Sequence, residues 1–174
     1  MLLDVPKIAV LVFVAAVLQA SVFSGVTILG GTPDLLLVTL VAVAFLRGSI
    51  AGAAAGFFGG LLIDTANLET LGVTSLLLTL AGYWIGRYGE TTARDRTRAP
   101  FLAVAVVTLL YAFGALAFRF MLGEPAPARV VLVETLLQGI ALNLLLTAPV
   151  YAIARQLLKP LERVDRMEGV RTLG

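Results

Sequence analysis

The stretch GSIAGAAAGFFGGLLID, residues 48–64, decides the fold, because glycine recurs in it at every fourth position. Glycine in the middle of a soluble helix costs about 1 kcal/mol relative to alanine, so a repeated glycine needs a structural reason. Four-residue spacing places these glycines along one helix face, and Gly59 lies on the neighbouring stripe. The glycines in register are Gly48, Gly52, Gly56 and Gly60.

A face of small residues has a use in lipid, where little hydrophobic driving force brings helices together. Such a face lets another backbone approach closely and gain contact. We therefore expect a docking groove along residues 48–64, filled either by a helix of this chain or by a partner protein. A second pair of small residues, Gly82 and Gly86, has the same spacing and the same two interpretations.

The composition places the chain in a membrane. Of its 174 residues 59% are hydrophobic and 14% are charged, whereas soluble domains have about 45–50% and about 25%. Cysteine and histidine are both absent, which removes thiolate nucleophiles, imidazole bases and the commonest metal ligands. Most enzymatic functions are therefore disfavoured, and we expect no metal, no cofactor and no nucleic-acid partner.

Six segments are apolar and long enough to be candidate membrane spans. They are residues 8–23, 33–46, 48–64, 73–88, 101–122 and 130–157. The second and third are short and closely joined, so they could form a tight transmembrane hairpin or a re-entrant pair. The prediction is an all-α membrane protein with one domain of six transmembrane helices, residues 1–157, and with both termini on the same side.

The positions of lysine and arginine give the orientation. If the N-terminus is cytoplasmic, only Arg119 and Arg129 of the 13 basic residues lie outside, as the positive-inside rule requires. Both termini are then cytoplasmic, and the first span is expected to be a retained helix rather than a cleaved signal peptide. The pattern of residues 158–174 predicts either a basic amphipathic cytoplasmic helix or a solvated tail.

Two acidic residues flank the predicted hairpin. Asp34 follows Pro33 at the start of the second span, where a carboxylate can cap the helix and face its positive end. Asp64 ends the third span, where a carboxylate opposes the helix dipole. Asp64 therefore needs a partner, which could be Arg119, Arg129 or the N-terminus of an adjacent helix.

The last span carries polar residues on two faces. Glu134 and Gln138 are four apart on one face, while Asn143 and Thr147 share roughly the opposite face. Ionisable groups inside a membrane usually point inward and often mark a functional site. Glu134 could line a polar cavity or pair with an arginine.

Several motifs occur together in an order that resembles a known family. They are TPDLLL at residues 32–37, a short turn at Arg47 and Gly48, GxxxGFxxGLLID at 52–64, and LGVTSLLLTLAGYWIG at 71–86. In this order they resemble the rod shape-determining protein MreD family over nearly the whole chain. The resemblance implies a non-enzymatic membrane scaffold of the bacterial cell-wall elongation complex in the inner membrane.

The resemblance also implies partners and a rival interpretation. MreD proteins associate with MreC and, through it, with RodA and a class B penicillin-binding protein, and membrane lipids surround them. The family is similar in architecture to the S components of energy-coupling-factor vitamin transporters, which bind a small molecule in an outward-facing polar pocket. The brief outer loops of this chain, poor in aromatic and hydrogen-bonding side chains, argue against such a pocket.

Overall fold

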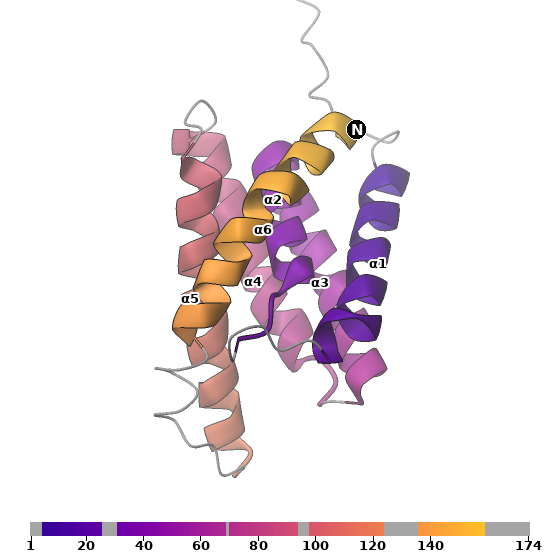
Figure 1. The fold of residues 1–174 in the computed structure, drawn as a ribbon, viewed down its shortest axis with the longest axis vertical. Coiled ribbons are helices and arrows are strands. Elements are labelled where there is room, and N and C mark those ends of the chain that lie inside the picture. The colour runs from indigo at the N-terminus through magenta and orange to yellow at the C-terminus, as the bar shows by residue number, and fades with distance from the viewer. Residues whose placement is uncertain (1–4, 26–30, 69, 94–97, 124–135, 159–174) are drawn as a thin grey trace, which may run out of the picture.

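The protein is all-helical in the part of the chain that its computed structural model describes, residues 5–25, 31–68, 70–93, 98–123 and 136–158 (Figure 1). The six α-helices in these ranges are α1 (Val5–Ser21), α2 (Leu35–Arg47), α3 (Ser49–Asn67), α4 (Val73–Tyr88), α5 (Ala99–Met121) and α6 (Leu136–Leu157). Two short helical turns, η1 (Phe23–Gly25) and η2 (Gly89–Ala93), follow α1 and α4. The expected all-α fold is therefore confirmed.

Consecutive helices alternate in direction, which gives the bundle two distinct ends (Figure 1). The Asp34 end, at the bottom of Figure 1, holds the starts of α2, α4 and α6. The Arg98 end, at the top, holds the starts of α1, α3 and α5. The start of α1 and the end of α6 thus lie at the same end of the bundle. The predicted tail beyond residue 158 lies outside the described residues.

Three helices, α3, α5 and α6, are long and apolar enough to cross a membrane, and α1 and α2 are shorter apolar helices. The helix bounds follow the predicted spans closely, and α4 covers residues 73–88 as expected. Six crossings and a cytoplasmic location of the termini stay predictions. One difference matters for the site, because α3 continues to Asn67, almost a full turn beyond Asp64.

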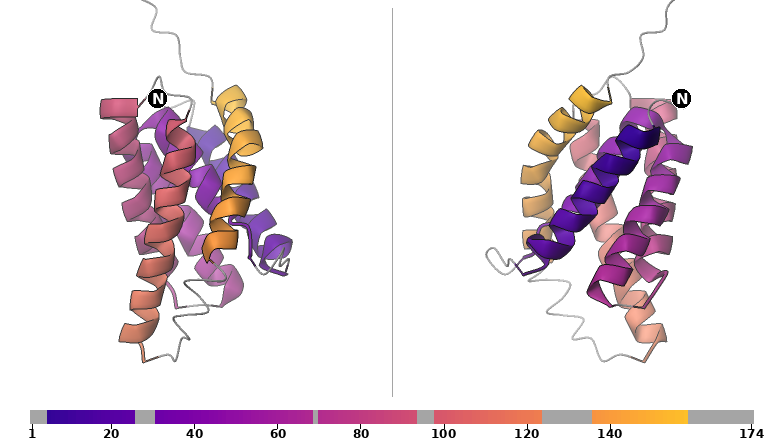
Figure 2. Two further views of the ribbon diagram at one scale, coloured as in Figure 1. Left: turned by 60° about the vertical axis from the view of Figure 1, so that its left-hand side comes forward. Right: turned by 90° about the vertical axis from the view of Figure 1, so that its right-hand side faces the viewer.

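Helix α2 is the centre of the bundle. All ten residues from 36 to 45 are buried, and α2 contacts each of the other five helices (Figure 2). A helix that is hydrophobic on every side belongs in the interior of a bundle, which explains its uninterrupted apolar sequence. Thirteen residues span about 20 Å, less than the roughly 30 Å of a hydrocarbon core. Helix α2 is therefore a short central helix that longer helices surround.

The turn between α2 and α3 depends on Gly48. This residue has φ +91°, a backbone conformation that side-chain-bearing residues rarely adopt, and it caps both helices. The prediction that Gly48 belongs to the helical stripe is therefore wrong in one respect. It is the turn residue, and the helix begins at Ser49.

The first turn of α3 is capped from a distance by Glu90, which lies in η2. Its Oε1 atom accepts hydrogen bonds from the Ser49 backbone N–H at 2.8 Å and from the Ser49 hydroxyl at 3.1 Å. These bonds, together with the nearby Arg87 guanidinium, hold the pKa of the Glu90 carboxyl below its ordinary value. The short helical turn after α4 thus supplies a cap for α3.

Replacing Glu90 by glutamine is expected to lower the thermal unfolding midpoint, because the charged acceptor at the N-terminus of α3 is lost. Since folding lowers the pKa of Glu90, its stabilising contribution is present above the ordinary glutamate pKa and fades as the pH falls below about 4. Thermal melts at pH 7 and pH 3.5 check this. The difference between wild type and Glu90→Gln should shrink at the lower pH.

The control is Arg87→Gln, which removes only an exposed ion pair of 3.4 Å with Glu90. It should change the midpoint less than Glu90→Gln at pH 7. Equal effects of the two variants would contradict the capping role.

Candidate functional site

The glycine stripe of α3 lies against α4 of the same chain. A β-carbon at Gly52 or Gly56 would overlap the carbonyl of Gly82 or Leu78. At Gly60 it would overlap the backbone of Ser75. The contact continues at the other end, where a β-carbon on Gly86 would come within 2.5 Å of the Ser49 backbone. The two antiparallel backbones therefore meet with no side chain between them.

This contact decides between the two interpretations of the stripe. Helices α3 and α4 pack more extensively than any other pair of described helices, so the groove is filled from within the chain. The Ser75 hydroxyl adds a hydrogen bond of 2.9 Å to the Phe57 carbonyl across the contact. Gly59 faces a different neighbour, since its β-carbon would lie 3.0 Å from the Leu36 side chain. The stripe is therefore covered within the chain and is not open to a partner helix.

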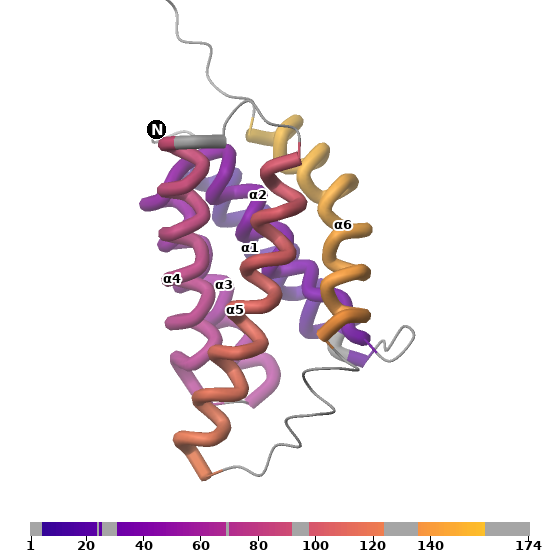
Figure 3. The backbone as a smooth tube through the Cα atoms, turned by 90° about the vertical axis from the view of Figure 1, so that its left-hand side faces the viewer, coloured from indigo at the N-terminus to yellow at the C-terminus, as the bar shows by residue number. Residues whose placement is uncertain are grey.

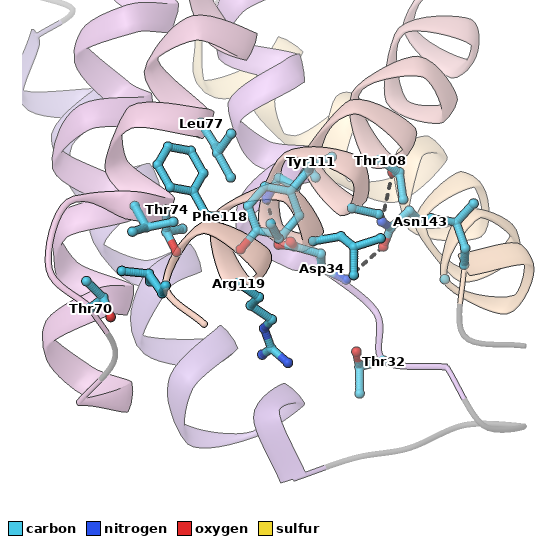
Figure 4. Close-up of a pocket in the computed structure, with 18 of the residues that line it drawn as sticks. Thr32, Asp34, Thr70, Thr74, Leu77, Thr108, Tyr111, Phe118, Arg119 and Asn143 are labelled. Atoms are coloured by element: carbon cyan, nitrogen blue, oxygen red, sulfur yellow. Dashed lines mark hydrogen bonds between the residues drawn. The ribbon is translucent and has the colours of Figure 1, made fainter. Parts of the chain in front are cut away.

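Asp34 caps α2, as the sequence predicted. Its Oδ1 atom accepts a hydrogen bond of 2.8 Å from the Leu37 N–H. Its own N–H donates to Asn143 Oδ1 in α6 at 2.7 Å, and Asn143 Nδ2 donates to the Thr108 hydroxyl of α5 at 3.1 Å (Figure 4). Asn143 is buried, so this predicted polar residue of the last span joins three helices.

Gln19 of α1 completes this network and was missed from the sequence. Its Oε1 atom accepts a hydrogen bond of 2.7 Å from the Leu35 N–H, and its Nε2 atom donates to the Pro33 carbonyl at 3.2 Å. A lone glutamine in an apolar span was the available signal, because a polar group in a membrane needs a partner. The start of α2 is thus held from both sides, by Gln19 and Asn143.

Asp64 is fully buried and faces the start of α4. Its Oδ2 atom accepts a hydrogen bond of 2.8 Å from the N–H of Gly72, the N-cap of α4. Of the three expected partners, the structure therefore selects the adjacent helix N-terminus, whose partial positive charge suits a carboxylate. The second oxygen, Oδ1, has no hydrogen-bond partner within the described ranges. Arg129 and Glu134 lie outside those ranges.

A cavity of about 620 Å³ opens at the Asp34 end (Figure 4). Its walls come from the start of α2, the α3–α4 turn, the end of α5 and the start of α6. Asp34 and Arg119 contribute opposite charges to the lining. The other lining residues with hydroxyl or amide groups are Thr32, Thr70, Thr74, Thr108, Tyr111 and Asn143. Gln138 lies outside this lining, beside Gly31.

The sequence argued against a ligand pocket at this end, yet the structure has a cavity there. That expectation was based on brief loops with few hydrogen-bonding side chains. The structure instead builds the cavity from helix ends, and it can do so because α5 extends beyond its neighbours at this end (Figure 3). The threonines at residues 70, 74 and 108 supply the hydrogen-bonding groups.

The chemistry of the cavity suits binding. Charged and hydroxyl groups converge on a concave surface of the size typical of ligand sites. Within the described part of the chain, no group of three or more acidic residues gathers that could hold a metal ion. The fold and cavity together define a helical bundle, compatible with a membrane protein, that has a recess of mixed polar and apolar lining at one end.

The family follows from comparison with known sequences. The model of the rod shape-determining protein MreD family matches residues 3–157, which is most of the chain. The chain belongs to this family, whose members are bacterial membrane proteins with a role in determining rod shape. Comparison with curated proteins and with solved structures finds no further match.

Proposed function

We propose that the protein is a non-enzymatic scaffold of the cell-wall elongation complex in the inner membrane, and that it binds MreC through the cavity at the Asp34 end. Family membership supports the scaffold role. The single observation that carries the binding site is the open cavity containing Asp34 and Arg119. By the positive-inside rule this end faces outward, where a periplasmic segment of a partner can reach it.

The contents of the cavity favour a polypeptide. An arginine and several threonine hydroxyls can pair with backbone carbonyls and side-chain oxygens, and the apolar wall can hold an anchoring side chain. The glycine stripe cannot serve, since α4 already covers it. Binding of MreC would bring RodA and the class B penicillin-binding protein near this chain, and peptidoglycan synthesis would depend on it indirectly.

Filling the cavity with Ala115→Phe is expected to reduce MreC co-purification about tenfold or more, because the phenyl ring occupies space that the partner needs. The matched control is Ala117→Phe, on the exposed face of the same helix and outside the cavity lining. The measurement is the yield of MreC that co-purifies with tagged protein from native membranes. Equal yields for Ala115→Phe and Ala117→Phe would reject the cavity as the contact.

The cavity also favours a second candidate, a substrate-binding S component of a vitamin transporter, because its volume suits a small molecule. Mass spectrometry of material purified from native membranes separates the two candidates. MreC without a bound vitamin supports the scaffold. A bound vitamin together with an ATPase module would overturn it.

A further inference from the structure

A second concave surface, the α4–α5 groove, lies on the side of the bundle. It has a volume of about 570 Å³ and lies between two helices that run side by side in Figure 3. Its lining is almost entirely apolar and includes Leu80, Trp84, Leu102, Val106 and Leu110. Trp84 and Val106 are 66% and 50% exposed, so bulky apolar side chains line a recess that the described residues leave open.

We propose that the α4–α5 groove binds one acyl chain of an anionic phospholipid, with the phosphate of its headgroup at Arg98. The leaflet concerned is the one at the Arg98 end, which is cytoplasmic in the proposed orientation. The proposal does not depend on MreC binding or on the cavity at the Asp34 end.

The length of the groove matches one leaflet. It runs along α4 from Leu77 to Tyr88, twelve residues whose eleven helical steps rise about 16 Å. Half of a hydrocarbon core is about 15 Å. Trp84 and Tyr88 lie in the part of the groove nearest the Arg98 end, where interfacial aromatics contact headgroups. An acyl chain that starts at that interface would fill the groove along its length.

The charge at the groove mouth suits a phosphate. Arg98 is exposed at the N-cap of α5, one turn before Leu102 of the groove lining, so its positive charge and the positive end of that helix are at the same end of the groove. Glu90 in η2 is engaged elsewhere, because its carboxylate accepts hydrogen bonds from Ser49 at the start of α3.

The surface of the groove favours a flexible chain over a helix. Close helix–helix contact in membranes uses small residues, as the α3–α4 contact of this protein does. The large side chains of Trp84, Leu102 and Leu110 line this groove instead. They would hold a partner helix away, whereas a single acyl chain can follow the space between them.

The test uses Trp84, the only tryptophan in the chain, as a probe. The full-length protein is placed in vesicles of phosphatidylcholine with increasing fractions of dibrominated phosphatidylglycerol or dibrominated phosphatidylcholine, which quench a tryptophan that they contact. We expect phosphatidylglycerol to quench at an approximately fivefold lower fraction, the preference that one arginine supplies near a membrane surface.

Two pairs of variants make the test specific. Arg98→Gln should abolish the preference for phosphatidylglycerol. Arg155→Gln should keep it, because Arg155 is an exposed arginine in the last turn of α6, at the same end of the bundle but outside the groove. Val106→Phe should raise the lipid fraction needed for quenching, while Val10→Phe, on the exposed side of α1, should not. Phenylalanine adds bulk without a second tryptophan.

Three results would overturn the proposal. The first is equal quenching of the wild type by the two lipids. The second is the same behaviour of Val106→Phe and Val10→Phe. The third is a native mass of two chains without bound lipid, which would assign the groove to a second copy of the protein. None of these results bears on MreC binding.

Discussion

Replacing Gly56 by leucine is expected to destabilise the protein by about 3 kcal/mol or more. A β-carbon at this position would overlap the Leu78 carbonyl, which belongs to a helix backbone and cannot rotate away as a side chain can. The helices must then separate, and the close contact at Gly52 and Gly60 is lost with it. Equilibrium unfolding in mixed detergent micelles measures the change.

The matched control is Ala54→Leu, two residues away on the exposed face of α3. It adds a larger side chain to the same helix without meeting α4, so its stability should stay close to wild type. MreC binding should fall for Gly56→Leu only as far as the folded fraction falls. A stable Gly56→Leu protein that has lost MreC would contradict the structure, because it would show that the stripe contacts the partner.

Replacing Asn143 by leucine is expected to cost about 2 kcal/mol. The change removes the acceptor of the Asp34 N–H and the donor to Thr108, leaving a partly buried backbone N–H without its partner. Hydrogen bonds between membrane helices contribute about 0.6 kcal/mol on average, so most of the loss comes from the unpaired group. The same unfolding measurement applies.

Gln156→Leu is the control, because Gln156 is an exposed polar residue of the same helix. Its free energy of unfolding should change little. If Asn143→Leu were as stable as Gln156→Leu, the network at the start of α2 would be unimportant for stability. In that case the role of the protein in rod shape could be measured in Asn143→Leu cells, because the variant would be fully folded.

The helices could be predicted from the sequence because each is apolar over most of its length and is bounded by glycine, proline or charge. Residues 73–88 illustrate this, with Gly72 before the helix and Arg87 within its last turn. Asp34 was also predictable, since a carboxylate after proline at the start of an apolar run is typical of a helix cap. Helix spans and caps of this kind depend only on residues that are close together in the sequence.

The cavity and the remote caps could not be predicted, because they depend on how helices pack. Glu90 caps a helix that begins 41 residues earlier, and Thr108 meets Asn143 across 35 residues. The glycine stripe predicted close packing, but the identity of the neighbour required the position of α4. The cavity at the Asp34 end exists because α5 extends beyond the neighbouring helices, and the composition of the loops does not reveal this difference in length.

Leu77 and Tyr111 each line both the cavity at the Asp34 end and the α4–α5 groove. The two side chains form a shared partition, so a rotation of either one enlarges one compartment at the expense of the other. If an occupant of one compartment shifts the partition, it alters the affinity of the other compartment. Thermodynamic linkage makes that influence equal in both directions.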